Sequence, residues 1–154
     1  MGTIEARLRE LGIELPAAAK PVANYVPFVR SGNLIFVAGQ IPVKDGQPQY
    51  KGILGFGVTV EDGAAAARLC AINILSQLKE ACGGDLDRVV RVVKLTGFVS
   101  CTGAFTDIPK VINGASDLMV SVFGDKGKHA RSAVGAPSLP LGVPVEVEAI
   151  VEIA

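Results

Sequence analysis

The C-terminal stretch HARSAVGAPSLPLGVPVEVEAIVEIA, residues 129–154, decides the fold. It carries one arginine, Arg131, among small residues, then a Pro/Gly-rich loop, and it closes in the alternating segment VEVEA at residues 145–149. Strict alternation of apolar and polar residues is typical of a strand with one buried face. Because arginine binds planar carboxylates through two parallel hydrogen bonds, Arg131 and the carboxylates of the following strand suggest an anion-binding pocket. A surface arginine beside a solvated strand face is the alternative that these residues leave open.

Two long amphipathic helices are predicted upstream of this stretch. The first is expected to begin after the N-cap Thr59, to run to about Ala81 and to stop at Gly83. The second is expected to begin at the capping residue Asp107 and to end at Gly124. Both segments carry apolar residues at the spacing of one helix face, so each is expected to pack against a sheet.

Strands are predicted from after Tyr25 to Arg30 and at residues 34–38, joined by a Ser-Gly-Asn turn, and at residues 88–101, where Gly97 is a candidate β-bulge. Two more strands are expected in the C-terminal stretch. Strands interleaved with two amphipathic helices predict an α+β fold, in which a mixed sheet has both long helices packed on one face.

The first 20 residues are expected to form an N-terminal extension with a short helix, and residues 21–154 to form one domain. Ile4, Leu8 and Leu11 repeat at helical spacing after Thr3, a possible cap, and Gly12 stands where a helix usually stops. The role of the extension is open, and covering a neighbouring subunit is one possibility.

The composition restricts the classes of function. Lys and Arg number 15, Asp and Glu also number 15, and no run of five like charges occurs, which argues against general nucleic-acid binding. Although 49% of the chain is apolar, no stretch reaches the roughly 18 apolar residues of a membrane helix. Surplus apolarity in a small domain suggests that partner subunits cover part of it, which predicts a homo-oligomer.

Cysteine usage predicts a cytoplasmic protein. Cys70, Cys82 and Cys101 are odd in number and lack the spacing of a zinc site or disulfide framework, so reduced thiols are expected. The first two fall on the apolar face of the first long helix, and Cys101 is expected to be a buried, inert thiol. The N-terminal residues are too charged for a secretory signal.

Several short motifs occur in order and at fitting distances along the chain. They are Tyr25 before Gly32-Asn33, then Gly39-Gln40-Ile41-Pro42, Asn73-Ile74-Leu75, Gly83, Ala130-Arg131-Ser132, Leu139-Pro140 and Val145 to Ala149. In these residues the chain resembles the reactive-intermediate deaminase family (Rid, or YjgF-type) from about Asn24 to the C-terminus.

The resemblance implies a chorismate-mutase-like domain that forms a homotrimer with pockets between subunits. It also implies hydrolysis of enamine or imine intermediates, such as 2-aminoacrylate, to 2-oxo acids and ammonia, without metal or organic cofactor. By position, Arg131 matches the family's carboxylate clamp, and Tyr25 and Glu146 match other pocket residues. The substrate-binding set that it implies is Arg131, Ser132, Ala133 and Gly39.

The residue types suit this chemistry. An imine needs its carboxylate held, its nitrogen protonated and a water placed over its electrophilic carbon. Arg131 can hold the carboxylate, and Glu146 is a candidate general acid/base. Tyr25 could position the water or form a pocket wall. Alternatively, Glu146 lies on a solvated strand face or lines a trimer interior, and Tyr25 only packs.

Three positions depart from the family's pattern. Ala133 stands where a cysteine is common, Ala38 where a serine is common, and Gly103 roughly where an asparagine often helps to bind substrate. These changes leave the substrate open, and they favour a rival function, a sensor or binding module for small carboxylates such as 2-oxo acids without turnover. An endoribonuclease, a label often attached to relatives, is the third candidate. His129, the only histidine, is interpreted as a solvated loop residue beside two lysines rather than as a base.

Overall fold

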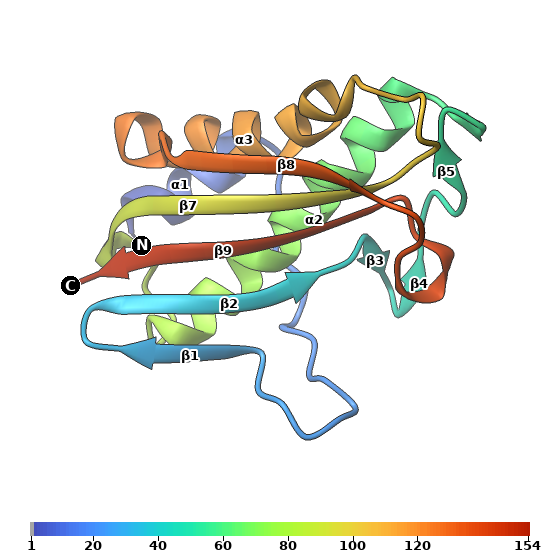
Figure 1. Ribbon diagram of the computed structural model, residues 1–154. Coiled ribbons are helices and arrows are strands. Elements are labelled where there is room, and N and C mark those ends of the chain that lie inside the picture. The colour runs from blue at the N-terminus through green and yellow to red at the C-terminus, as the bar shows by residue number, and fades with distance from the viewer. Residues whose placement is uncertain (1) are drawn as a thin grey trace.

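The computed structural model describes residues 2–154 and contains one large mixed sheet. Its order is β1-β2-β9-β7-β8, with β8 parallel to β7 and the other neighbours antiparallel (Figure 1). The five strands are β1 (Phe28–Ser31), β2 (Leu34–Gln40), β7 (Val89–Ser100), β8 (Ala130–Ala136) and β9 (Val145–Ile153). The edges of the sheet are therefore β1 and β8.

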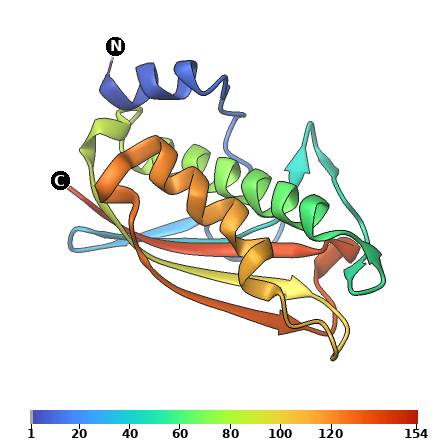
Figure 2. The ribbon, with the colours of Figure 1, turned by 90° about the horizontal axis from the view of Figure 1, so that it is seen from above.

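Three α-helices lie on one side of this sheet (Figure 2). They are α1 (Thr3–Glu10), α2 (Val60–Ala81) and α3 (Ile108–Phe123). The two long helices, α2 and α3, contact each other and the sheet, which confirms the predicted α+β class with both helices on one face. No helix among residues 2–154 has the length and apolarity that crossing a bilayer requires.

Short elements complete the chain. A hairpin of two-residue strands and a parallel pair of two-residue strands precede α2, and three 3-10 turns follow it. They are β3 (Val43–Lys44) with β4 (Gln47–Pro48), β5 (Ile53–Leu54) with β6 (Gly57–Val58), and η1 (Leu86–Arg88), η2 (Gly124–Gly127) and η3 (Pro140–Gly142).

The alternation of β9 divides the sheet into two different faces. Val145, Val147, Ala149, Val151 and Ile153 are buried in the core beneath the helices. The residues between them, Glu146, Glu148, Ile150 and Glu152, point to the opposite side, which no helix of the described residues covers (Figure 2). We call this side the open face. The site depends on which residues of the other strands share it.

The predicted helix caps are partly right. The Thr59 hydroxyl accepts the Asp62 backbone N–H at 3.1 Å, as expected for the N-cap of α2. Asp107 precedes α3, but its side chain makes no capping hydrogen bond and instead pairs with Lys110 at 3.6 Å. Since Pro109 occupies the first turn, that turn has one backbone N–H fewer to satisfy.

The prediction of a bulge at Gly97 is wrong. The irregular register of β7 lies nearer its start, between Val89 and Lys94, whereas Gly97 pairs regularly with both neighbouring strands. A side chain at Gly97 would collide with Ile112 of α3. Glycine is needed there because α3 packs directly on the strand.

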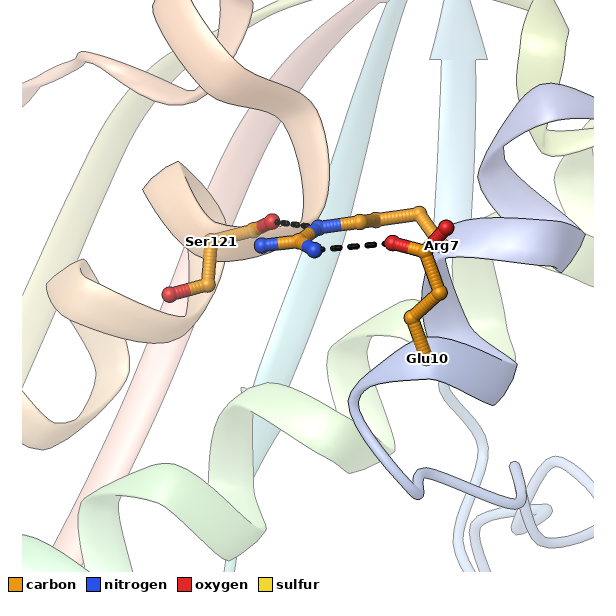
Figure 3. A network of polar contacts seen from close by, with 3 residues as sticks. All are labelled: Arg7, Glu10 and Ser121. Atoms are coloured by element: carbon orange, nitrogen blue, oxygen red, sulfur yellow. Dashed lines mark hydrogen bonds and ion pairs between the residues drawn. The ribbon is translucent and has the colours of Figure 1, made fainter.

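The N-terminal helix packs on its own chain. Thr3 lies inside α1 rather than capping it, and the backbone N–H groups of Thr3 and Ile4 each donate to the Asp87 carboxylate at 2.9 Å. Arg7 Nε donates to the Ser121 carbonyl of α3 at 2.8 Å, and its Nη1 pairs with Glu10 at 3.0 Å (Figure 3). The extension therefore covers α3 and η1 of its own subunit. The division into residues 1–20 and 21–154 stays a prediction.

Candidate functional site

Arg131 lies on the helix face of the edge strand β8. It pairs with the core residue Leu95 of β7, so both side chains point toward the helices. Its Nη1 donates to Asn113 Oδ1 at 2.8 Å and to Ser116 Oγ at 3.2 Å, both on α3. Within residues 2–154 neither Nε nor Nη2 of Arg131 donates a side-chain hydrogen bond. The guanidinium is thus fixed at one end and leaves the edge that binds carboxylates bidentately free.

His129 is part of the same group of contacts. Its Nδ1 lies 2.6 Å from the Gly127 carbonyl and its Nε2 lies 2.9 Å from Ser116 Oγ. A carbonyl can only accept, so we assign the Nδ1–H tautomer, in which Nε2 accepts the Ser116 hydroxyl proton. The interpretation of His129 as a solvated loop residue is wrong, because its ring is half-buried and both ring nitrogens are engaged.

Sequence reasoning missed Asn113 and Ser116. Both belong to α3, which is otherwise read as an apolar helix, and they are spaced i and i+3, so they lie on one face. A polar pair of this kind within an apolar helix was the available signal. Their partner on β8 could not be read from the sequence, because it depends on which strand α3 covers.

Glu146 lies on the open face, away from Arg131. It is half-buried over Gly39 of β2, where an added Cβ would collide with the Glu146 carboxylate. Burial raises the pKa of Glu146, and the neighbouring Glu148 charge raises it further. Gly39 therefore provides the room for a carboxyl group that keeps its proton more readily than an exposed glutamate does.

The two residues after Arg131 point to opposite faces of the sheet. Ser132 pairs with Thr96 and points to the open face, whereas Ala133 pairs with Gly97 and points to the helices. Ala133 is partly buried against the core. A cysteine at that position would lie on the same face as Arg131.

Tyr25 lies in the loop before β1, and its side chain is 58% exposed. β1 and β8 are the two edges of the sheet (Figure 1). Four strand spacings, about 19 Å, therefore separate β1, which follows Tyr25, from β8, which carries Arg131. One chain thus brings Glu146 and Gly39 together, but it brings neither Glu146 nor Tyr25 to Arg131.

Hollows within the single chain lie elsewhere. Three hollows, of about 750, 450 and 310 Å³, adjoin the segment that follows α1. Their other walls come from α2, the β3–β4 hairpin and α3. Arg131, Glu146 and Tyr25 line none of them. Nor do residues 2–154 bring together three or more His, Cys, Asp or Glu side chains in a way that could hold a metal ion.

The open face carries exposed apolar side chains beside its carboxylates. Val29, Phe36 and Val134 are 51%, 42% and 45% exposed, and they come from three different strands. Phe36 pairs with Ile150 and Val134 pairs with Phe98, which places both on the side of Glu146. An uncovered apolar sheet face of this kind is typical of a surface that a partner covers.

Comparison with known proteins agrees with this architecture. Residues 5–153 match the model of the family described as "YjgF/chorismate_mutase-like, putative endoribonuclease". The chain is 52% identical to Protein TCP17 of Trypanosoma cruzi over 153 residues, which is 99% of this chain and 95% of that protein.

Solved structures share the fold. Atu1372 of Agrobacterium tumefaciens, a protein of unknown function, is 51% identical, with a TM-score of 0.92 over 98% of this chain and 92% of that chain. TdcF of E. coli with bound serine is 24% identical, with a TM-score of 0.65 over 89% of this chain and 94% of that chain, and shows likeness of fold alone. The resemblance carried by the sequence motifs is confirmed, and the chain belongs to the YjgF/Rid family, with that family's chorismate-mutase-like α+β fold.

Proposed function

We propose that this protein hydrolyses enamine or imine intermediates, such as 2-aminoacrylate, to 2-oxo acids and ammonia in pockets between the subunits of a homotrimer. The observation that carries the proposal is the state of Arg131. Its Nη1 is held by Asn113 and Ser116, while its Nε–Nη2 edge makes no hydrogen bond within residues 2–154. A guanidinium presented in this way suits a small substrate carboxylate.

The pocket is proposed to take residues from two copies of the chain. Arg131 belongs to one copy, and Glu146, Gly39 and Tyr25 belong to its neighbour. Two observations support this arrangement. Arg131 and Glu146 point to opposite faces of the sheet, and Tyr25 and Arg131 stand at opposite edges of it. The apolar open face supplies a surface through which copies could associate.

The reaction needs one acid/base group and one water. Protonation of 2-aminoacrylate at its terminal carbon gives the iminium of 2-iminopropanoate. Water then adds to the C=N carbon and passes a proton to the nitrogen. The carbinolamine expels ammonia while its hydroxyl proton returns to the acid/base group, which leaves pyruvate. Glu146 is assigned these proton transfers, because its raised pKa lets it hold and return a proton closer to neutral pH than an exposed glutamate. Tyr25 is assigned to hold the water or to wall the pocket, and Ser132 and Gly39 to line it.

A binding module for small carboxylates without turnover is the rival function. The bound serine of TdcF is a small molecule with a carboxylate, held by a protein of the same fold. Ala133, Ala38 and Gly103 favour this rival, because each lacks the polar side chain that family enzymes commonly carry at that position. The endoribonuclease in the family's description is less favoured, because 15 basic and 15 acidic residues give no net positive field for RNA.

Three measurements separate the three candidates. An amino-acid lyase generates 2-aminoacrylate in situ, and ammonia release is followed with wild type and with Arg131→Ala. If wild type accelerates ammonia release and Arg131→Ala does not, the deaminase function is supported. Saturable 2-oxo acid binding without acceleration supports the binding module, and RNA binding that weakens steeply with salt supports the nuclease.

The cytoplasm is the proposed location. Cys70, Cys82 and Cys101 are all free, and free thiols persist in a reducing compartment. Burial raises the pKa of Cys70 and of Cys82, so neither is disposed to react as a thiolate.

A further inference from the structure

We propose that Asn113, Ser116 and His129 are positioning residues that fix the Arg131 guanidinium for the carboxylate of its ligand. The inference rests on the proposed function in one respect, that Arg131 binds a carboxylate. It does not require that the ligand is hydrolysed. None of the three residues is needed to touch the substrate.

The hydrogen bonds form one chain with a single consistent direction. Arg131 Nη1 donates to Ser116 Oγ at 3.2 Å, and the Ser116 hydroxyl donates onward to His129 Nε2 at 2.9 Å. His129 Nδ1–H then donates to the Gly127 carbonyl at 2.6 Å, and that carbonyl ends the chain. Every donor has one acceptor, so in the Nδ1–H tautomer the acceptor Nε2 determines which way the Ser116 hydroxyl points.

Asn113 fixes the other proton of the same nitrogen. Arg131 Nη1 donates to Asn113 Oδ1 at 2.8 Å, so both of its N–H groups are used within the protein. With Nη1 held twice, rotation of the planar guanidinium would break both contacts. The Nε–Nη2 edge is thereby held in one orientation before a ligand arrives, which lowers the entropic cost of binding.

The anchoring residues come from firmly placed elements. Asn113 and Ser116 lie on α3. The residue that precedes each of them, Ile112 and Ala115, is fully buried and anchors the helix. Gly127, which accepts from His129, is itself buried, and a Cβ there would collide with the Met119 carbonyl of α3. The chain of contacts therefore connects β8 to α3 through groups that cannot easily shift.

A Ser–His pair can also be a nucleophile with its base, but the surroundings of Ser116 argue against that role here. Ser116 lies in the middle of α3, where backbone N–H groups are used in helical hydrogen bonds and cannot stabilise an oxyanion. Its oxygen also accepts from a guanidinium, which lowers its nucleophilicity. Positioning is the role that the geometry supports.

The first experiment measures affinity for 2-oxobutanoate, a carboxylate probe, by calorimetry. Ser116→Ala and Asn113→Ala are each expected to raise its Kd about 10-fold, the effect of one lost charge-assisted hydrogen bond on a clamp's geometry. Ser116→Thr, which keeps the hydroxyl, is expected to restore most of the affinity. Ser121→Ala is the matched control, because Ser121 lies on the same helix and contributes its carbonyl to Arg7.

The second experiment uses the single histidine as a probe. Nitrogen-15 NMR of wild type is expected to show His129 protonated at Nδ1 and unprotonated at Nε2. In Ser116→Ala the Nε2 resonance is expected to shift, because its donor is gone. This readout needs neither ligand nor catalysis, so it tests the chain of contacts by itself.

The outcomes separate this inference from the deaminase proposal. Suppose that neither the wild type nor any variant hydrolyses imines, but that the Kd for 2-oxobutanoate still depends on Ser116 and Asn113. The deaminase proposal then fails and the positioning role stands. If hydrolysis is present, the variants are expected to raise KM more than they lower kcat. Unchanged Kd in Ser116→Ala and Asn113→Ala, an Nε2–H tautomer, or a wild type that binds no carboxylate overturns the inference.

Discussion

At the scale of single residues, the chemistry depends on how one guanidinium is held. Arg131 could in principle be a loose cation at a strand edge, but two side chains of α3 hold its Nη1. What remains for a ligand is a planar pair of N–H donors rather than a bare charge. Geometry should therefore matter as much as charge at this position.

Replacing Arg131 by lysine tests that point. Arg131→Lys keeps the positive charge but loses the planar pair of donors, so we expect kcat/KM for imine hydrolysis to fall about 10-fold or more, and Arg131→Ala to cost more still. The comparison is made by steady-state kinetics, with thermal unfolding to show that both variants stay folded. Full activity of Arg131→Lys would mean that charge alone is sufficient.

Glu146 should make stability depend on pH. Burial and the Glu148 charge raise its pKa in the folded state, so the folded protein binds this proton more tightly than the unfolded chain. Its stabilising contribution is therefore present below the unfolded pKa and is lost as pH rises through the raised folded pKa.

We accordingly expect Glu146→Gln to be more stable than wild type at about pH 8 and to lose that advantage toward about pH 4. Because the carboxyl is only half-buried, the gain at high pH should stay below about 1 kcal/mol. Denaturant unfolding at fixed protein concentration measures it, with Glu14→Gln as control, because Glu14 is exposed and no ion pair among residues 2–154 involves it. A variant that is less stable than wild type at high pH would contradict the assignment.

The residue types of the site could be predicted, but their orientation could not. Arg131 and Glu146 were found from their motifs. The strand that carries Arg131 contains mostly Ala, Gly and Ser, so no apolar alternation reveals which of its side chains face the helices. The contacts of His129 with α3 depend on tertiary packing, which is why the interpretation of this residue failed.

At the scale of elements, the site depends on how closely α3 approaches its neighbours. A Cβ at Gly114 would fall on the Ala64 carbonyl of α2, so the two helix backbones are nearly in contact there. Gly97 has the same function between β7 and α3, where Ile112 occupies the space above it. Because α3 also carries Asn113 and Ser116, the distance of α3 from α2 and from β7 determines where Arg131 is anchored.

Gly114→Ala should consequently separate the two helices. The new methyl group meets backbone, which cannot rotate away, so we expect a loss of about 2–3 kcal/mol in the free energy of unfolding. Gly103→Ala is the matched control, since a Cβ there meets nothing within 4 Å and the backbone is not left-handed. Equal stability of the two variants in chemical denaturation would show that the approach of α2 and α3 is not tight.

The N-terminal helix offers a second element-scale test. Hydrogen bonds from the backbone N–H groups of Ile4 and Thr3 lower the pKa of Asp87. The ionised Asp87 carboxylate therefore stabilises the start of α1 at pH values above the ordinary carboxyl range, and this stabilisation is lost as pH falls through the lowered pKa. Asp87→Ala is expected to speed hydrogen exchange across Thr3–Glu10, measured by mass spectrometry, while α2 stays protected. Asp117→Ala, an exposed carboxylate on α3, should leave α1 unchanged. Unaltered exchange in Asp87→Ala would mean that other contacts hold α1.

The long elements were predictable because their local signals agree. Thr59 and Glu61 at the start of α2 and the glycines after it mark both ends, and the apolar stripe marks its buried face. The short strands β3 to β6 lack any such signal, since two residues cannot show a period. Gly97 was misassigned because a glycine in a strand indicates either a bulge or close packing, and only the structure distinguishes the two.

At the scale of the whole molecule, one face of the sheet is covered by helices and the other is open (Figure 2). The open face combines exposed apolar side chains with the carboxylates of β9. Arg131 lies on the covered face, at the edge strand β8. In the proposed homotrimer, the edge of one copy meets the open face of the next, and each pocket contains one Arg131 and one neighbouring Glu146.

The most direct test of this arrangement mixes two inactive proteins. Arg131→Ala and Glu146→Gln are each expected to have little activity alone. Equal amounts are co-expressed under different tags, and tandem purification selects assemblies that contain both chains. If each pocket takes Arg131 from one copy and Glu146 from the next, one pocket of each mixed trimer, about a third of all pockets after tandem purification, is intact, and imine hydrolysis returns in that proportion. Mixed assemblies that remain as inactive as their parents would contradict the shared pocket.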